Sequence, residues 1–263
     1  MMKVCSLFSG SSGNSIFIAN DDTKILVDAG LSAKRIIEAL CSIDEDPMEL
    51  SAVLISHEHS DHTKGAGILS RKLGIPLYAN EETWLSMESD LGKINPENKM
   101  YFDMNSEFEI GSIKIKAFAI PHDAANPVGF NLFSKDRKFT VATDIGHITK
   151  KLLGCFEMSD MILLESNHDV DMLKIGRYPW PLKKRILSEK GHLSNEMAGK
   201  VIEYMACRGT RKFLLGHLSQ ENNFPELAYQ TVYNVLCGNP EIRSTEIMLD
   251  IAHRDSVGRV IEV

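Results

Sequence analysis

The sequence contains few cysteines, and no two of them form a Cys-x-x-Cys pair. Its five cysteines are spread along 263 residues. This spacing argues against a disulfide framework and against a zinc site built from thiolates. We therefore expect reduced, mostly buried thiols, as is typical of a cytoplasmic protein.

Long apolar runs and sequence repeats are also absent. No stretch approaches the roughly 18 apolar residues that a membrane-spanning helix needs, so no membrane segment is expected. The first residues include a lysine but no long apolar segment and no Ala-x-Ala site, so no signal peptide is expected. Without a linker or low-complexity tract, the simplest interpretation is one domain over residues 1–263. No feature of the sequence indicates an oligomeric state.

Positive charge is scarce too, because the formal net charge is −7. Such a protein repels nucleic acid overall, so binding a polynucleotide would require a local basic patch or bound cations. Residues 174–190 form a basic stretch that includes Tyr178 and Trp180, whose rings can stack on bases. The stretch is either a solvated helix face or a polynucleotide contact. Its three consecutive basic residues are Lys183, Lys184 and Arg185.

Apolar runs separated by turns predict strands and helices in both halves of the chain. Strands are expected at residues 4–8, 15–20, 24–30, 52–56, 75–80, 106–120, 128–134, 138–144, 160–166, 211–217, 246–253 and 258–263. Helices are expected at residues 32–40, 65–73, 81–91, 194–206 and 224–236, with Ser32 and Ser194 as N-caps. The pattern predicts two packed sheets flanked by helices, an α+β sandwich.

One loop contains a third of the nine histidines. Residues 57–62, with the sequence HEHSDH, directly follow an apolar run. Alternate residues of an extended segment project to one side, so two imidazoles reach one point, and a carboxylate and a third imidazole reach an adjacent one. These ligand types suit zinc, iron and manganese. The pattern predicts two metal ions, where a lone His-x-His would indicate only a solvated polar loop.

Two metal ions need further ligands, and the ends of apolar runs supply candidates. Asp28, His122, Asp144 and His217 each follow such a run, whereas His192 precedes a helix. Strand ends at one edge of a sheet converge in space, and such edges often carry binding sites. The three remaining histidines are expected in surface or structural roles: His147, His168 and His253.

This set of residues resembles the metallo-β-lactamase fold superfamily over nearly the whole chain. The stretches SLFSGSSGNS, SHEHSDHTKG, ESNHD, GHLSN and GHLSQENN look like the YycJ/WalJ group of bacterial proteins. The resemblance implies an αββα sandwich with two divalent transition-metal ions, zinc or manganese with iron as a further candidate. It also implies a nuclease related to the ribonuclease Z and phosphodiesterase branch, with 5′-3′ DNA exonuclease activity as the expectation.

The resemblance further assigns the ligands. One ion would be held by His57, His59 and His122, the other by Asp61, His62 and His217, with Asp144 bridging the two. Asp28 would be a carboxylate behind the ligands that orients the histidine loop. Its alternative role is to form the turn before Gly30.

Two more residues resemble a pair found in the ribonuclease Z-like branch. Glu165 would keep His192 protonated, and His192 would contact the phosphate or protonate the leaving oxygen. With Asp61, they are the expected catalytic residues. The alternative makes His192 part of a helix cap and Glu165 a charge at a strand end.

The small-residue stretch near the N-terminus has two interpretations. It is a tight turn between strands, or it cradles a phosphate through backbone N–H groups and the side chains of Ser11, Ser12 and Asn14.

Together these expectations predict a phosphodiesterase or nuclease. Two metal ions about 3.5–4 Å apart can share a bridging hydroxide that attacks phosphorus in line. A carboxyl-ester, thioester or lactam hydrolase would use the same chemistry, but the Glu165–His192 pair and the basic stretch favour phosphate. An oxygen-reducing di-iron protein is disfavoured by His59, and a silent binding module by the complete ligand set.

Overall fold

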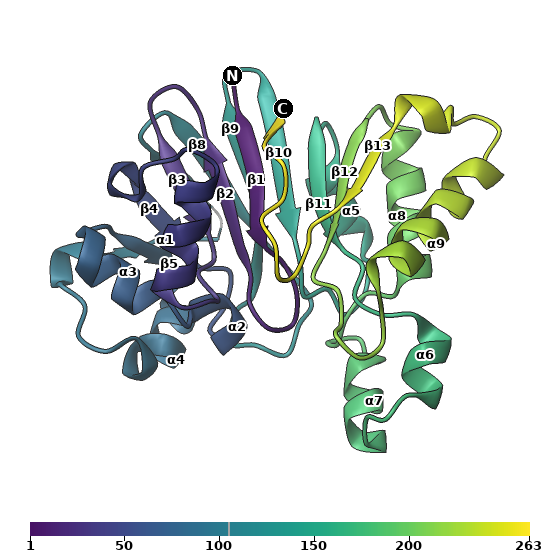
Figure 1. The fold of residues 1–263 in the computed structure, drawn as a ribbon, viewed down its shortest axis with the longest axis horizontal. Helices are drawn as coiled ribbons and strands as arrows, with labels where there is room; N and C mark the ends of the chain where they lie inside the picture. The colour runs from purple at the N-terminus through teal and green to yellow at the C-terminus, as the bar shows by residue number, and fades with distance from the viewer. Residues whose placement is uncertain (105) are drawn as a thin grey trace.

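The computed structural model describes residues 1–104 and 106–263, and its centre is a pair of β-sheets packed face to face (Figure 1). Each sheet has seven strands. From edge to edge, the first sheet contains β14 (Ile261–Glu262), β1 (Lys3–Phe8), β2 (Ser15–Ala19), β3 (Lys24–Val27), β4 (Ala52–Leu54), β5 (Leu77–Ala79) and β6 (Lys99–Tyr101). The second sheet contains β13 (Met248–Ile251), β12 (Lys212–Gly216), β11 (Met161–Glu165), β10 (Arg137–Ala142), β9 (Val128–Ser134), β8 (Ile113–Ala119) and β7 (Glu107–Ile110).

Both sheets change from antiparallel to parallel pairing along their width. In the first sheet, β14, β1, β2 and β3 pair antiparallel, and β3 to β6 pair parallel. In the second, β7 to β10 pair antiparallel, and β10 to β13 pair parallel. The strand β8 therefore runs in the same direction as β10, β11 and β12. The chain leaves all four of these strands at the same edge of the sheet, which positions the site described below.

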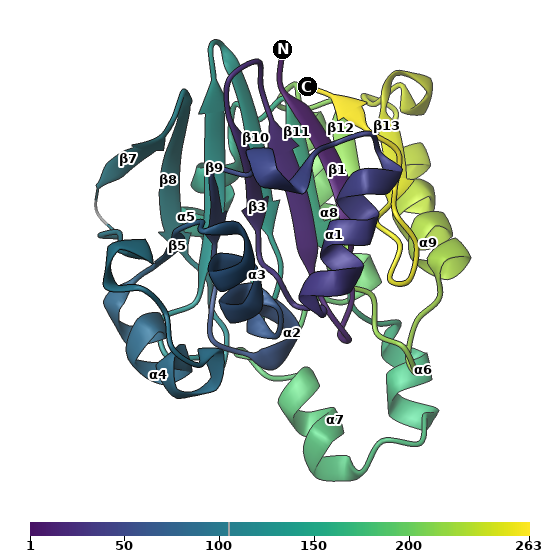
Figure 2. The ribbon, with the colours of Figure 1, turned by 60° about the vertical axis from the view of Figure 1, so that its left-hand side comes forward.

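Helices cover the outer face of each sheet (Figures 1 and 2). The first sheet is covered by α1 (Ala33–Ser42), α3 (Ala66–Leu73) and α4 (Glu81–Leu91), and the second by α5 (Lys150–Phe156), α8 (Asn195–Ala206) and α9 (Pro225–Gly238). Two short helices, α6 (Val170–Ile175) and α7 (Trp180–Ile186), extend beyond the sheets at the end where α2 (Ser60–Thr63) lies. Three short 3-10 helices complete the described elements: η1 (Pro47–Glu49), η2 (Pro96–Asn98) and η3 (Ser244–Glu246).

Apolar side chains fill the space between the sheets and the space under each helical layer. Val27 and Leu54 of the first sheet belong to one buried cluster with Phe130 and Leu163 of the second. Alternate residues of the same strands, such as Leu164, pack under the outer helices. Because both faces of β4 and β11 are buried, these strands are nearly continuous apolar runs and show no polar alternation.

The predicted α+β sandwich is confirmed, as are both predicted N-caps. The Ser32 hydroxyl accepts a hydrogen bond from the backbone N–H of Arg35 (3.4 Å), and that of Ser194 accepts one from Met197 (3.3 Å). Among the described residues, no helix combines the length and apolar character required to cross a membrane.

The prediction of mostly buried cysteines is wrong. Cys5 is buried and Cys155 is half-buried, whereas Cys41, Cys207 and Cys237 are exposed. The three exposed thiols lie on α1, at the end of α8 and on α9, on sides that do not face a sheet. All five thiols are unpaired.

Candidate metal centre

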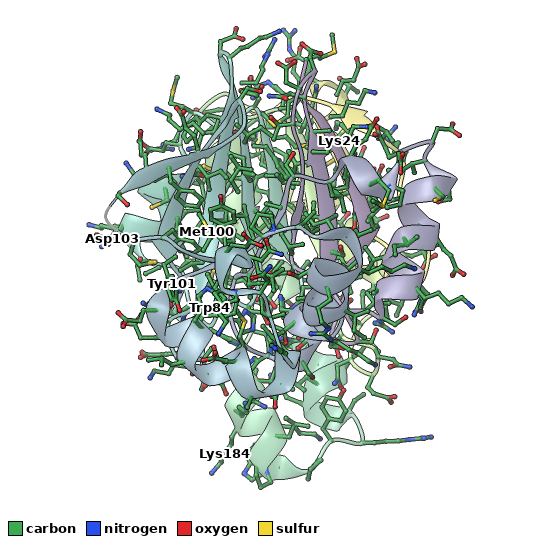
Figure 3. All side chains as sticks on the ribbon, turned by 90° about the vertical axis from the view of Figure 1, so that its left-hand side faces the viewer. Lys24, Trp84, Met100, Tyr101, Asp103 and Lys184 are labelled. Carbon is green, nitrogen blue, oxygen red and sulfur yellow. The ribbon has the colours of Figure 1, made fainter. Side chains whose placement is uncertain are left out.

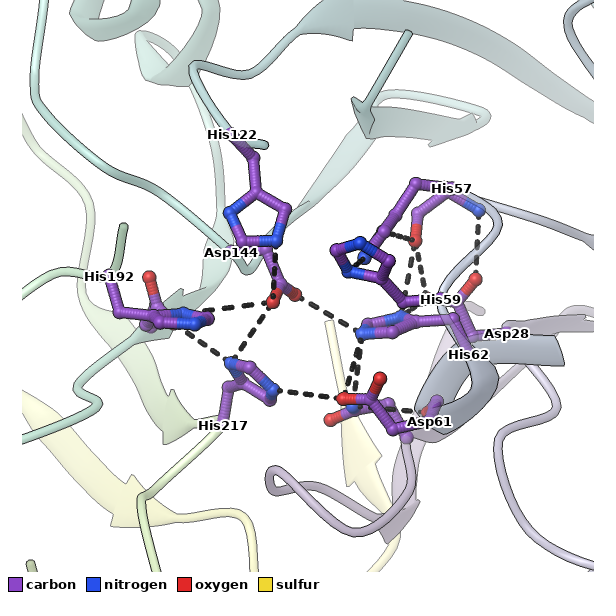
Figure 4. Close-up of polar contacts among 12 residues, drawn as sticks. Asp28, His57, His59, Asp61, His62, His122, Asp144, His192 and His217 are labelled. Carbon is purple, nitrogen blue, oxygen red and sulfur yellow. Dashed lines mark hydrogen bonds and ion pairs between the residues drawn. The ribbon is translucent and has the colours of Figure 1, made fainter. Parts of the chain in front are cut away.

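The histidine-rich loop leaves the first sheet at the end of β4, and α2 begins at Ser60. The rings of His57 and His59 meet edge to face, with Nε2 of His57 3.1 Å from Nδ1 of His59. The one-turn helix α2 then carries Asp61 and His62 to a second point of the same site (Figure 4). The loop is therefore extended at His57 and His59, which belong to one ligand group, and helical at Asp61 and His62, which belong to the other.

Three predicted site residues come directly after strands in an uncommon backbone conformation. Asp28 follows β3, Asp144 lies just beyond β10, and His217 follows β12; their φ values are 63°, 60° and 55°. Residues other than glycine seldom adopt a left-handed backbone, and those that do cluster at functional sites. The sharp turn at each residue ends the strand and keeps the residue at the sheet edge.

The seven predicted ligands come together at this edge (Figure 4). Donor atoms lie within 4.8 Å of one another in each of three groups: His57, His59 and His122; Asp61, His62 and His217; and His57, His62 and Asp144. Oδ2 of Asp144 is 3.2 Å from Nε2 of His62, and its Oδ1 is 3.6 Å from Nε2 of His122. Asp144 thus lies between the two ligand groups.

The donor atoms fit divalent metal ions. Nε2 of His122, Nε2 of His217 and Oδ2 of Asp144 are buried and make no hydrogen bond. Nitrogen or oxygen ligands about 2.0–2.1 Å from a tetrahedral zinc ion lie roughly 3.3 Å apart, and four neighbouring donor pairs here are 3.1 to 3.6 Å apart. Buried polar atoms without partners are rare in proteins, and a bound cation would satisfy these three.

The charges in the centre also favour a cation. Burial opposes charge on His62, but Asp28, Asp144 and Asp61 together raise its pKa well above the usual value. Burial likewise opposes charge on Asp144, yet His217 and His62 hold its pKa well below the usual range. Asp144 therefore stays ionised at neutral pH, and the field that favours the proton on His62 also attracts a divalent cation.

Asp28 supports the ligand loop of the first sheet from behind. Its Oδ1 accepts a hydrogen bond from the Ser56 N–H (2.8 Å), and its Oδ2 lies 2.8 Å from the Ser56 hydroxyl and 2.7 Å from Nδ1 of His62. This leaves Nε2 of His62 for the metal centre. A Cβ at Gly30 would lie 1.7 Å from the carbonyl oxygen of Asp61, so glycine is required where this turn meets the loop.

Glu165 plays the corresponding part in the second sheet, but it contacts two histidines. Its Oε1 is 2.8 Å from Nδ1 of His192 and 2.8 Å from Nδ1 of His217, while its Oε2 accepts hydrogen bonds from the N–H groups of Ile145 and Leu193. Burial would raise the pKa of Glu165, but the two histidines lower it to about 2. Burial would lower the pKa of His192, but Glu165 raises it above the usual value. Glu165 is therefore an ionised carboxylate at neutral pH, and it favours the protonated form of His192.

Comparison with known proteins agrees with this geometry. A family model described as "Beta-lactamase superfamily domain" matches residues 23–218. The chain is 45% identical over 236 residues to "Exodeoxyribonuclease WalJ" of Streptococcus pneumoniae serotype 2 (strain D39 / NCTC 7466), covering 89% of this chain and 88% of that protein. It is 40% identical over 230 residues to "Exodeoxyribonuclease YycJ" of Bacillus anthracis, covering 88% and 87%. The chain belongs to the WalJ/YycJ family of the β-lactamase superfamily.

A solved structure shows the same fold as this WalJ/YycJ family member. The metallo-β-lactamase fold protein YhfI from Bacillus subtilis superposes with a TM-score of 0.74 over 100% of both chains, at 17% identity. At this identity the likeness shows the fold alone. The predicted αββα sandwich and the resemblance on which it rested are both confirmed.

The N-terminal turn of this family member serves mainly to build the site. Asn14 is buried; its Oδ1 accepts from the Gly10 N–H (2.9 Å), and its Nδ2 lies 3.1 Å from the Gly10 carbonyl and 3.2 Å from Nε2 of His62. Ser11 and Ser12 are exposed. Of the three predicted phosphate contacts, Asn14 is thus occupied inside the protein, and only the two serines remain open to a substrate.

The three consecutive basic residues have different environments. Lys183 is buried, and its ammonium group donates to the carbonyls of Lys174 and Gly176, both at 2.7 Å. It ties α7 to the end of α6 and is not available to a polynucleotide. Lys184 is exposed on the protruding α7 (Figure 3). Arg185 is half-exposed and pairs with Asp123 beside the metal centre.

Sequence reasoning missed two residues of the site, Ser56 and Asp123, and did not predict the burial of His168. Ser56 joins Asp28 to the ligand loop, and Oδ1 of Asp123 lies 3.3 Å from Nε2 of His122. Both are adjacent in sequence to a predicted ligand, which was the available signal. His168, expected at the surface or in a structural role, is buried and lines a cavity with His192. Of the other two histidines set aside, His147 is half-buried and contacts the Glu189 carbonyl, and His253 is exposed.

Proposed function

We propose that the protein is a dinuclear metal-dependent phosphodiesterase that degrades DNA as a 5′-3′ exonuclease. The observation that carries this proposal is His192, a histidine held by Glu165 at 2.8 Å directly beside the group of seven metal ligands. The relatives' printed names, both exodeoxyribonucleases, support it. Histidine nitrogens and carboxylate oxygens suit zinc or manganese, with iron as a further candidate.

The bound cations would neutralise the phosphate and lower the pKa of the attacking water. The chain supplies the other parts of the reaction. Asp28 and Glu165 orient His62 and His217 through their Nδ1 atoms. The Nδ1 atom of His192 faces Glu165, which leaves its Nε2–H to protonate the leaving oxygen. A sugar alkoxide is a poor leaving group, so a proton donor at this position favours phosphate esters of sugars.

Several exposed groups are positioned to contact the DNA strand. Ser11 and Ser12 lie on the turn next to the ligand loop, and Lys184 and Arg185 lie on α7. They provide local contacts on a protein whose net charge is −7. The five unpaired cysteines agree with action in the cytoplasm, which we also propose.

An end-labelling assay tests the function. Protein stripped with a chelator and reloaded with zinc or manganese is given DNA labelled at the 5′ or the 3′ end, RNA, bis-p-nitrophenyl phosphate and a thioester. We expect 5′-labelled DNA to release labelled mononucleotide at once, and 3′-labelled DNA to shorten stepwise. The His59→Ala protein, prepared in parallel, detects contaminating nuclease. Thioester hydrolysis without DNA cleavage would instead support the alternative hydrolase.

A further inference from the structure

A cavity of about 290 Å³ lies next to His192, outside the group of metal ligands. It is enclosed by the loop after β10, the start of α6, the end of α7 and the start of α8. His192 lines the cavity and also contacts the rings of His122 and His217 in the metal centre. A ligand in the cavity would therefore lie one side chain away from the reacting phosphate.

His168 is the unexplained residue of this cavity. It is 1% exposed, and neither ring nitrogen has a hydrogen-bond partner among the described residues. Its backbone is fixed by a bridge to Ser194 and by a hydrogen bond from the Asn195 N–H to its carbonyl (2.9 Å). A buried polar group without a hydrogen bond is costly and therefore rare. This indicates that water or a ligand forms hydrogen bonds with the ring nitrogens of His168.

The chemistry of the cavity fits a flat, neutral ring with polar edges. Burial lowers the pKa of His168 to about 4, so its imidazole is neutral at pH 7 and offers one donor and one acceptor. Ile148, Leu187 and Met197 supply apolar surface. Leu187 and Met197 are also exposed, so the cavity is open to solvent. Its volume is at the lower end of the roughly 300–1,000 Å³ range of small-ligand sites, which suits a single nucleotide unit.

We propose that this cavity binds the base of the nucleotide released in each cycle, with His168 hydrogen-bonding the edge of that base. The inference rests on the proposed function. In 5′-3′ hydrolysis the leaving oxygen is O3′ of the terminal nucleotide, and His192 protonates this oxygen. The base attached to that nucleotide then extends past His192, where the cavity lies. Apolar walls accept the face of any base, so the site promotes binding without strong sequence preference.

Direct titration tests the proposal. Binding of deoxyadenosine 3′-monophosphate and of 2-deoxyribose 3-phosphate, which carry the phosphate on O3′ as at the scissile bond, to the metal-loaded protein is measured by calorimetry. Both ligands carry the same sugar and phosphate, so their difference reports the base alone. We expect the nucleotide to bind about tenfold more tightly, the typical effect of one base contact.

Two variants locate the effect. Met197→Trp fills the cavity from its exposed side and should abolish the preference for the nucleotide, whereas Met48→Trp, at a methionine exposed on η1, should keep it. His168→Phe keeps a planar ring but removes both nitrogens. It should lose most of the preference with an unchanged or higher melting temperature, because no polar group is left unpaired.

Equal binding of the two ligands by the wild type would overturn the proposal and indicate that water fills the cavity. A preference retained in both Met197→Trp and His168→Phe would also overturn it. DNA hydrolysis by the same preparations separates this outcome from failure of the proposed function. Cleavage of DNA together with equal binding of the two titrated ligands rejects the cavity alone, and absence of cleavage rejects the nuclease.

Discussion

The two sheets each place one buried carboxylate behind the metal centre, and the two carboxylates differ in what they hold. Asp28, at the end of β3, contacts one predicted ligand, His62, and the loop residue Ser56. Glu165, at the end of β11, contacts one predicted ligand, His217, and one residue outside the ligand set, His192. The first sheet therefore holds only a predicted ligand, whereas the second also links the site to His192, the proposed proton donor.

This difference predicts that the two sheets contribute unequally to the reaction. Substituting Asp28, which holds His62, should alter metal binding and therefore lower the hydrolysis of every substrate to the same extent. A change behind His192 should also depend on how much the leaving group needs a proton. The following variants test that division, beginning with the largest expected effect.

Replacing the ligand that Asp28 holds should abolish the enzyme. His62→Ala should lose one of the two metal ions and with it nearly all hydrolysis, because Asp61 and His217 alone do not complete the second ligand group. Metal content by elemental analysis and activity on DNA and bis-p-nitrophenyl phosphate are measured together. The exposed His253→Ala is the matched control and should retain both. Full metal content in His62→Ala would remove this residue from the ligand set.

Replacing the non-ligand that Glu165 holds should be selective. His192→Ala should lower DNA hydrolysis by about 10²–10⁴-fold, since general-acid catalysis typically contributes that much. p-Nitrophenolate leaves without a proton, so hydrolysis of bis-p-nitrophenyl phosphate should fall much less, and metal content should not change. Loss of metal would make His192 a ligand, and equal losses on both substrates would indicate phosphate binding in place of proton donation.

Metal affinity should rise with pH. Burial would lower the pKa of His217, but Asp144, Asp61 and Glu165 raise it to about 10 in the metal-free protein. A raised pKa means that this contribution to the stability of the metal-free fold is present below about pH 6.5 and is lost as pH rises through 10. Metal must displace that proton, so affinity should increase about tenfold per pH unit between pH 7 and 9. Competition titrations across this range measure the slope, and a flat profile would show that His217 is already neutral.

The smallest effect is expected on α7 and the segment that precedes it, away from both carboxylates. Replacing Lys184 on α7 and Arg177 in the segment between α6 and α7 by glutamine should weaken DNA binding. The slope of log affinity against log salt concentration should fall by about one for each phosphate that the protein no longer neutralises. Both residues are exposed, and neither contacts a ligand. The matched pair Lys34→Gln and Lys72→Gln, exposed on α1 and α3, should leave the slope unchanged. A similar decrease in both pairs would mean that overall charge, and not α7, determines DNA affinity.

Local patterns predicted much of this architecture. The apolar runs that end in Asp28, Asp144 and His217 are buried on both faces, so their ends marked the sheet edge directly. The strand β6 escaped notice because three residues, half-buried or exposed, show no apolar pattern. Spacing along the chain also does not reveal shared partners. The family resemblance implied the pairing of Glu165 with His192, but neither the resemblance nor the spacing indicated the second contact, with His217, which lies 52 residues away.

Side-chain burial was the other property that could not be predicted from the sequence. Lys183 and Lys184 are neighbours in one basic run, yet α7 turns the first inward and the second outward. Likewise, nothing in the sequence around His168 indicates that it is buried. Tertiary packing places it in the cavity that His192 also lines. A charge or an imidazole in a sequence predicts what a residue can do, and its environment decides whether it does so.

The central claim is that Glu165 links the metal centre to proton donation and Asp28 does not. Asp28→Asn and Glu165→Gln, each at matched metal content, are compared by the ratio of DNA hydrolysis to bis-p-nitrophenyl phosphate hydrolysis. Metal affinity should fall in both, by about 10–100-fold. We predict that this ratio equals the wild-type ratio in Asp28→Asn and is several-fold lower than the wild-type ratio in Glu165→Gln. The same ratio in both variants would contradict it.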